Sequence, residues 1–151
     1  MSLESEIEEK LREEFKEKIL EVKIPGEHRI FVSVPSPQVK ELVNYLRQNF
    51  GLTHITTISA IDIGDDIEVL YHFFCRGVTI RLRTLVPKTE PVIDTITPII
   101  LGAILYEREI QDLLGLKVKD HPDPRRLVLP EDWPEGVYPL RRDYQVGFKG
   151  G

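Results

Sequence analysis

The sequence predicts an α+β fold: an antiparallel or mixed sheet of about five strands, three helices on one face, and an extended proline-rich C-terminal tail. Three observations support this prediction. Apolar residues recur at helical spacing in two segments, short apolar runs are joined by turn-forming residues, and five of the eleven prolines lie between His121 and Tyr144. We therefore expect residues 1–118 to form one α+β domain and residues 119–151 to form the tail.

The N-terminal part is predicted to be a helix followed by a β-hairpin. Apolar residues recur every four positions among charged residues, at Leu3, Ile7, Leu11 and Phe15. Two short apolar runs follow, Ile19–Ile24 and Arg29–Val34, and the residues between them are Pro25-Gly26-Glu27-His28. Proline and glycine between two apolar runs indicate a turn, so the runs are predicted to pair as a hairpin.

A second helix and three strands are predicted next. Ser36 suits the cap position of the helix, Pro37 suits its first turn, and Gly51 suits its end. The buried stripe of this helix comprises Val39, Leu42, Val43, Leu46 and Phe50. Glycine-containing turns then join three strands, Thr53–Ile63, Ile67–Cys75 and Val78–Val86.

A last helix leads into the tail. It is predicted to run from Thr95 or Ile99 to Leu114, and Gly115 ends it. The tail cannot be a long helix, because proline lacks the N–H donor and clashes with the preceding turn. It is also too aromatic and too apolar for solvated disorder. A semi-rigid, extended segment is therefore expected.

Composition excludes several classes of protein. The chain has 151 residues, 41% of them hydrophobic and 30% charged, which suits one globular domain. Its net charge is −5, whereas a protein that coats nucleic acid is expected to be basic. Met1–Lys18 lacks the apolar run of a signal peptide, and the longest apolar stretch, Ile99–Tyr106, is far shorter than a membrane span. The sequence thus predicts a soluble intracellular protein.

The potential metal ligands are not arranged as a site. His28 and His54 lie beside predicted turns, while His72 and Cys75 are three residues apart on a strand and point to opposite faces. A single cysteine cannot by itself hold an iron–sulfur cluster or a structural zinc ion. Phosphate-binding loops, nucleophile elbows and dinucleotide fingerprints are also missing from the sequence. We expect no metal or cofactor in this chain.

The last helix carries two carboxylates that could share one face, Glu109 and Asp112, which are three residues apart. One interpretation is a paired-carboxylate acid/base site. The other is a helix end that forms salt bridges with a partner protein or with Arg125 and Arg126. We favour the second interpretation, because charged residues on a helix surface are usually not catalytic.

The tail also admits two interpretations. It could be a lid, with Trp133 and Tyr144 burying apolar surface of the same chain. It could instead be a clasp that binds another protein. Its arginines are Arg125, Arg126, Arg141 and Arg142. Arginine forks suit interface carboxylates, and Trp, Tyr and Arg are enriched at the centres of interfaces, so we favour the clasp.

These same residues carry a family resemblance. The chain contains "ERE" at Glu107–Glu109, followed by Asp112-Leu113 and Gly115. The segments "HPDPRRLVLPEDW" and "PLRRDY" come after them. In this order and spacing they resemble the signature of the 30-kDa subunit family of respiratory NADH dehydrogenase (complex I). That family includes the matching subunits of energy-converting membrane-bound hydrogenases.

The resemblance implies a non-catalytic assembly subunit of a membrane-bound, ion-pumping oxidoreductase. Such a subunit has no cofactor of its own and packs against a large catalytic subunit of the quinone-site or nickel–iron type, over which its C-terminal segment wraps. A small iron–sulfur subunit is a further expected partner, and iron–sulfur clusters or nickel–iron belong to the partner subunits. The expected location is peripheral, on the cytoplasmic face of the cell membrane.

The resemblance also implies which residues form the partner interface. They are Glu107, Arg108, Glu109, Asp112, His121, Pro122, Asp123, Arg125, Arg126, Pro130, Glu131, Asp132, Trp133, Pro139, Leu140, Arg141, Arg142, Asp143 and Tyr144.

Two departures from the respiratory pattern indicate the branch. "EDWPEGVYPLRRDY" carries extra residues, Pro134–Tyr138, and aliphatic Ile104 and Leu105 replace the aromatic residues often found before "ERE". Both favour a ferredoxin-linked hydrogenase or its sulfur-reducing relative. The matching C subunit of respiratory NADH:quinone oxidoreductase is the alternative. A nucleic-acid adaptor would rest only on the tail arginines, and the acidic residues between them argue against it.

Overall fold

The main sheet is mixed and has five strands. The structure is a computed structural model that describes residues 2–144. The strands lie in the order β1-β2-β5-β4-β3, and their bounds are β1 Glu21–Gly26, β2 Arg29–Ser33, β3 His54–Asp62, β4 Asp66–Cys75 and β5 Val78–Pro87. The β2–β5 pair is parallel and the other pairs are antiparallel. The predicted α+β class, the five-stranded mixed sheet and the hairpins are thus confirmed.

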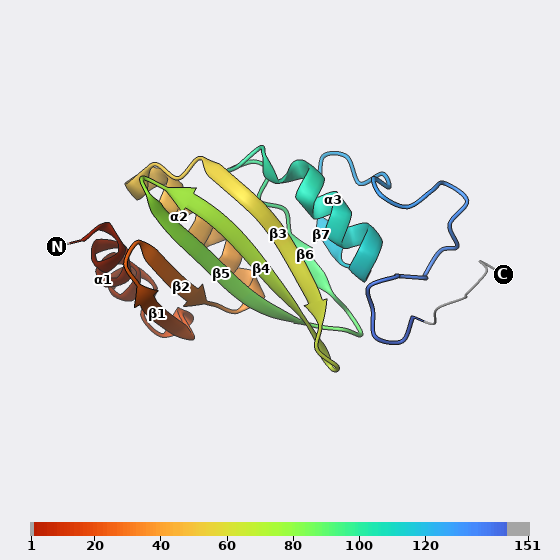
Figure 1. Ribbon diagram of the computed structural model, residues 1–151, viewed down its shortest axis with the longest axis horizontal. Coiled ribbons are helices and arrows are strands. Elements are labelled where there is room, and N and C mark those ends of the chain that lie inside the picture. The colour runs from red at the N-terminus through yellow and green to blue at the C-terminus, as the bar shows by residue number, and fades with distance from the viewer. Residues whose placement is uncertain (1, 145–151) are drawn as a thin grey trace.

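Three helices complete the domain: α1 (Leu3–Phe15), α2 (Val39–Phe50) and α3 (Ala103–Leu114). All three contribute to one hydrophobic core with the strand residues of one sheet face, so they cover that face together. Figure 1 shows α1, β1 and β2 at one end of the molecule and α3 with the chain that follows it at the other end. No helix within residues 2–144 has the length and apolar character needed to cross a membrane.

The strands of the sheet centre alternate between the core and an open face. In β4, Val69, Tyr71 and Phe73 are fully buried, while the residues between them are only half-buried. Leu82 of β5 lies beside Tyr71 and Val32 and points the same way. Apolar residues at every second position therefore place one face of the sheet in the core and leave the other face open.

The structure differs from the prediction around the last helix. Helix α3 begins at Ala103 rather than at Thr95 or Ile99, and α2 begins at Val39 after a short 3₁₀ turn that starts at Ser36. The segment before α3 does not continue the helix, because it binds a side chain of that helix through its own hydroxyl and N–H groups. A second, two-stranded parallel sheet was not predicted; it consists of β6 (Val92–Asp94) and β7 (Lys117–Lys119).

Two helices end at a glycine with left-handed backbone, Gly51 (φ 74°) after α2 and Gly115 (φ 77°) after α3. A methyl group built on Gly51 meets nothing within 4 Å, whereas one on Gly115 would lie 2.5 Å from Cε2 of Tyr138 and 2.7 Å from Nη2 of Arg141. The two glycines therefore have the same backbone constraint, but only Gly115 lies under the C-terminal part of the chain.

This pair of glycines provides a matched test of that packing. Gly51→Ala is expected to lower the free energy of unfolding by about 1–2 kcal/mol, the cost of a left-handed alanine. Gly115→Ala should cost a further ~1–3 kcal/mol, because the Tyr138 ring must move. Urea unfolding of both variants measures the difference. Equal losses would contradict the packing of Tyr138 on the end of α3.

Candidate functional site: the C-terminal strap on helix α3

The residues from His121 to Tyr144, here called the strap, follow β7 and lie against helix α3. The main attachment is the carboxylate of Asp112, whose residue is only 5% exposed. Its Oδ2 accepts hydrogen bonds from the backbone N–H groups of Leu127, Val128 and Leu129, at 2.8, 2.8 and 3.2 Å. Three consecutive N–H groups can reach one oxygen only if the backbone is bent around it. Asp112 therefore fixes the shape of the strap as well as its place.

The neighbouring turns of α3 supply hydrogen-bond donors to the strap. Arg108 donates from Nε to the carbonyl of Arg125 at 2.8 Å and from Nη2 to that of Arg126 at 3.0 Å. Its Nη1 lies 3.5 Å from the Asp123 carboxylate. Gln111 donates from Nε2 to the carbonyl of Pro124 at 2.9 Å. Arg108, Gln111 and Asp112 thus bind the backbone of one continuous stretch of the strap.

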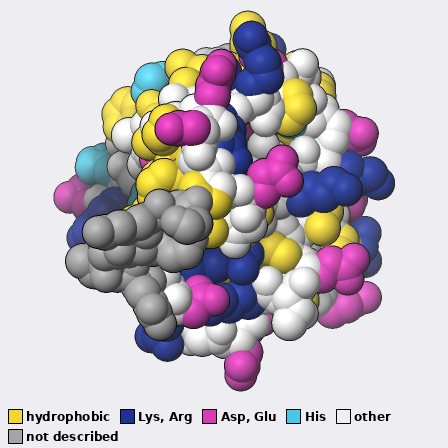
Figure 2. All heavy atoms as spheres, turned by 90° about the vertical axis from the view of Figure 1, so that its right-hand side faces the viewer, with side chains coloured by type: hydrophobic (Ala, Val, Ile, Leu, Met, Phe, Trp, Pro, Cys, Tyr) yellow, Lys and Arg dark blue, Asp and Glu magenta, His cyan; other side chains and the backbone are white. Residues whose placement is uncertain are grey.

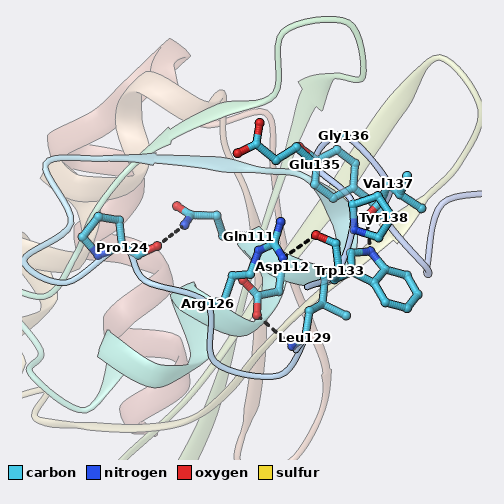
Figure 3. A pocket seen from close by; sticks show the side chains of 11 residues that line it. Gln111, Asp112, Pro124, Arg126, Leu129, Trp133, Glu135, Gly136, Val137 and Tyr138 are labelled. Atoms are coloured by element: carbon cyan, nitrogen blue, oxygen red, sulfur yellow. Dashed lines mark hydrogen bonds between the residues drawn. The ribbon is translucent and has the colours of Figure 1, made fainter. Parts of the chain in front are cut away.

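Beyond this attachment the strap forms a loop that is closed by its own side chains (Figure 3). Nη1 of Arg126 donates to the carbonyls of Pro130, Glu131 and Trp133, at 3.0, 3.3 and 2.6 Å. The Trp133 indole N–H donates to the carbonyl of Val137 at 2.8 Å. The loop and the end of α3 line an open pocket of about 390 Å³. The guanidinium of Arg126 therefore orders the loop instead of projecting from it.

The far end of the strap returns to the domain. Leu140 N–H donates to the carbonyl of Leu113 at 3.0 Å, and Arg141 Nε donates to that of Leu114 at 2.7 Å. These two carbonyls belong to the last turn of α3, where helical partners are lacking. The strap thus satisfies acceptors that the helix leaves open, and it is held at both ends.

A second buried carboxylate, Asp62 at the end of β3, also binds the strap. Its Oδ2 accepts from the N–H of Arg142 at 2.9 Å and lies 2.6 Å from Nζ of Lys88, while Oδ1 accepts from the N–H of Gly64. Burial raises the pKa of Asp62, but the Lys88 ammonium and the two N–H donors outweigh it and lower the pKa to about 2. Asp62 is therefore held ionised.

Glu107 lies inside the domain, where its side chain has no exposed surface. It accepts hydrogen bonds from the Thr95 hydroxyl at 2.5 Å and from the Ile96 N–H at 2.9 Å, and its Oε1 is 3.7 Å from Nε2 of His121. Burial raises the pKa of Glu107, while these hydrogen-bond donors and the nearby His121 act to lower it by a smaller amount. The sequence placed Glu107 at a partner surface; the structure instead uses it to join the segment before α3 to the start of the strap.

The predicted interface residues divide into two groups. Those with exposed side chains are Pro122, Arg125, Pro130, Glu131, Asp132, Leu140, Arg142 and Asp143. The others are buried or half-buried: Glu107, Arg108, Glu109, Asp112, His121, Asp123, Arg126, Trp133, Pro139, Arg141 and Tyr144. The second group includes Arg108, Asp112, Arg126 and Arg141, whose side chains hold the strap on its own chain.

The structure also bears on the alternatives for the charged residues. Within residues 2–144, Arg125 pairs with Asp123, so the helix end does not form the expected salt bridges with Arg125 and Arg126. The Oδ2 oxygen of Asp112 accepts three backbone N–H groups of the strap, and no hydrogen bond joins Asp112 to Glu109 among the described residues. Trp133 and Tyr144 contact each other, with ring centroids 6.3 Å apart, and stay half-buried. The strap lies on its own chain, as the lid interpretation expects, and the clasp interpretation stays a prediction.

Sequence reasoning missed Asp62 and Gln111. Neither lies in a recognisable local pattern. Asp62 binds a residue eighty positions further along the chain, which no local spacing reveals. Among the described residues, no group of three or more His, Cys, Asp or Glu side chains is arranged to hold a metal ion.

The outer surface of the strap is partly apolar. Leu127, Val128 and Leu140 are 41%, 51% and 56% exposed, and the Arg125 side chain is 81% exposed. Figure 2 looks onto this end of the molecule and shows apolar side chains gathered beside basic ones. The strap thus combines a polar inner side with an outer side of mixed apolar and charged character.

Comparison with known proteins agrees with the signature. Residues 32–149 match the model of the family described as "Respiratory-chain NADH dehydrogenase, 30 Kd subunit". The C subunit of the F(420)H(2) dehydrogenase of Methanosarcina mazei is 34% identical over 93% of this chain and 90% of its own length. The beta subunit of the membrane-bound hydrogenase of Pyrococcus furiosus is 32% identical over 95% and 87%. The C subunit of the NADH-quinone oxidoreductase of Geotalea uraniireducens is 37% identical over 91% and 85%.

The fold is shared with a solved structure. A chain of the membrane-bound sulfane sulfur reductase, an archaeal respiratory membrane complex, superposes with a TM-score of 0.83 over 94% of this chain and 85% of that one, at 22% identity. That likeness concerns the fold alone. The family model covers most of the chain, including the strap, and the relatives match nearly end to end. The chain therefore belongs to the 30-kDa subunit family of respiratory-chain NADH dehydrogenase.

Proposed function

We propose that this chain is a non-catalytic assembly subunit of a membrane-bound, complex I-like oxidoreductase, and that the strap is its docking surface for the large catalytic subunit. The observation that carries the proposal is that the strap binds its own chain on one side and leaves apolar side chains exposed on the other. Its backbone N–H groups at Leu127 and Val128 and the side chains of Arg126 and Arg141 form hydrogen bonds within the chain. The side chains of Leu127, Val128 and Leu140 are exposed and not covered. A surface already fixed in shape loses little conformational entropy when a partner binds.

The proposed assembly follows from the family. The large partner is of the quinone-site or nickel–iron type, and a small iron–sulfur subunit is a second neighbour. Iron–sulfur clusters and nickel–iron reside in those partners, and this chain holds no cofactor. It is placed peripherally on the cytoplasmic face of the membrane, held there by the other subunits. This arrangement leaves binding and positioning as the tasks of the present chain.

We further propose the hydrogenase or sulfur-reducing branch, on the basis of the extra residues Pro134–Tyr138. Those residues lengthen the loop that Arg126 and Trp133 close, so the branch-specific feature lies on the docking surface itself. Respiratory NADH:quinone oxidoreductase is the alternative, and the similar identities of 32% and 37% to the two kinds of relative do not separate them. In the neighbouring gene for the large subunit, nickel-binding cysteines would mark the hydrogenase branch, and their absence would point to the sulfur-reducing or respiratory branch.

The docking surface can be tested with charged substitutions. Leu127→Asp combined with Val128→Asp should reduce co-purification of a tagged large subunit at least ten-fold, because two charges would be buried in the interface. Leu20→Asp is the matched control, since Leu20 is 68% exposed and lies beside β1, at the other end of the molecule. Unchanged recovery of the large subunit with the double variant would exclude the strap as its docking surface.

A second test concerns the attachment of the strap. Asp112→Ala leaves three backbone N–H groups without their acceptor, which should cost about 1–3 kcal/mol and raise the population of the open strap about five-fold or more. Trypsin cleavage after Arg126 in the folded chain should accelerate accordingly. Glu109→Ala removes a carboxylate from the same helix that has no such role, and should leave cleavage unchanged. Equal cleavage rates in the two variants would refute the role of Asp112.

A third test uses pH. The pKa of Asp62 is about 2 in the folded chain, below its ordinary 3.8, so its stabilising effect is complete above about pH 4 and disappears as the pH falls toward 2. Asp62→Asn should therefore be less stable than the wild type at pH 7, and the difference should narrow at pH 2.5. Urea unfolding measures both. Asp65→Asn, in the exposed turn nearby, controls for charge, and a pH-independent gap for Asp62→Asn would contradict the ion pair.

A further inference from the structure

The open face of the sheet carries an ordered row of side chains that crosses all five strands. The strand registers place Lys23, Phe31, Arg81, His72 and Thr57 side by side, from β1 to β3. These residues alternate with the buried ones, so they all point away from the core. Among the described helices, none packs over this face, since α1, α2 and α3 share the core with its other side.

Two ion pairs lie on this face, and Arg81 belongs to neither. Arg83 lies 2.6 Å from Glu68, and Lys23 lies 2.8 Å from Glu21. Arg81 lies with its guanidinium carbon 3.7 Å from the centroid of the Phe31 ring. Within residues 2–144 it forms no ion pair, and its buried Nε has no hydrogen-bond partner. A half-buried arginine donor without an acceptor is costly in an isolated chain.

The surroundings of Arg81 can receive a side chain. A hollow of about 440 Å³ lies over the β1, β2 and β5 strands and is lined by Glu21, Lys23, Pro25, Phe31, Ser33, Arg81 and Arg83. Arg81 thus faces a space that is lined by the aromatic ring of Phe31 and by polar side chains. The neighbouring His72 is held toward its neutral form, because burial and the charge of Arg81 lower its pKa.

We propose that this face docks an acidic segment of another protein, with a carboxylate bound to Arg81 and an apolar neighbour resting on Phe31. A guanidinium binds a carboxylate through two parallel hydrogen bonds, which would supply the acceptor that Nε lacks. The row combines an aromatic residue, an arginine and polar residues, a composition that is typical of protein interfaces. Glu21 and Glu68 on the same face are already paired with Lys23 and Arg83, so Arg81 is the cation of the hollow that has no carboxylate partner among the described residues.

This second surface is separate from the strap. The hollow includes residues of β1 and β2, which lie at the opposite end of the molecule from the strap. The acidic segment therefore belongs to a different contact from the one proposed for the large subunit on Leu127 and Val128. The inference rests on the proposed function only in that its partner is another subunit of the same complex.

The first arm of the test is a labelling experiment on the complex purified through a tag on this chain. Ser33→Cys places a thiol in the hollow, and the natural Cys75 is buried. Labelling of this thiol with N-ethylmaleimide is expected to be at least ten-fold slower in the complex than in the free chain. Adding Arg81→Gln should restore fast labelling, whereas Arg76→Gln, in the exposed β4–β5 turn, should not.

The second arm identifies the bound group. Arg81→Lys presents an amine that carbodiimide can join to a carboxylate in contact with it, and mass spectrometry should find the cross-link to an Asp or Glu of another subunit. Three results would overturn the proposal: equal labelling in complex and free chain, protection that Arg81→Gln leaves unchanged, or cross-links only to Glu21 or Glu68. A chain that purifies without any other subunit would overturn the proposed function as well.

Discussion

The strap depends on one interaction, the binding of three consecutive backbone N–H groups by the carboxylate of Asp112. A proline-rich segment with no helix or strand cannot satisfy its own N–H groups, and exposed N–H groups would leave its path undefined. Asp112 collects three of them at one point on a rigid helix. Arg108, one turn earlier on α3, and Gln111, next to Asp112, bind the carbonyls of Pro124, Arg125 and Arg126, which come just before these N–H groups in the chain. The helix thus acts as a template for a segment without regular structure.

Several charged residues of the signature bind groups of their own chain. Arginines beside prolines and a tryptophan are typical of interface hot spots. Here Arg126 and Arg141 donate to carbonyls of their own chain, and Arg125 pairs with Asp123. If the strap is the docking surface proposed above, these arginines contribute indirectly: they fix the shape of a surface whose exposed side chains are partly apolar and partly charged. Pre-organisation of this kind lowers the entropic cost of association.

Much of the fold follows from local patterns. The hairpins, the alternation along β4 and β5, and the glycines that end α2 and α3 were all predictable, because each depends on residues close in sequence. The parallel β2–β5 pair and the β6–β7 sheet depend on contacts between distant segments, and a three-residue strand such as β7 has too few residues to show a period. For the same reason the start of α3 was placed too early.

The site was predictable as a region but not as a geometry. The family signature indicated which residues matter, and the relatives confirm the family. The spacing of Glu107, Glu109 and Asp112 along a helix does not reveal that Glu107 faces the core, that Asp112 faces the strap, or that Asp62 contributes from another strand. Those assignments depend on how α3 is rotated against the sheet, which only tertiary packing determines.

Backbone amide exchange in the isolated chain tests whether the strap is fixed on α3 before any partner binds. The amides of Leu127, Val128 and Leu129 bind Asp112, and that of Arg142 binds Asp62. Each should exchange about a hundred-fold or more slowly than in an unstructured peptide, as a locally stable hydrogen bond requires. Exchange of all four at the unstructured rate would show that the strap acquires its shape only on the partner, and would contradict a pre-formed docking surface.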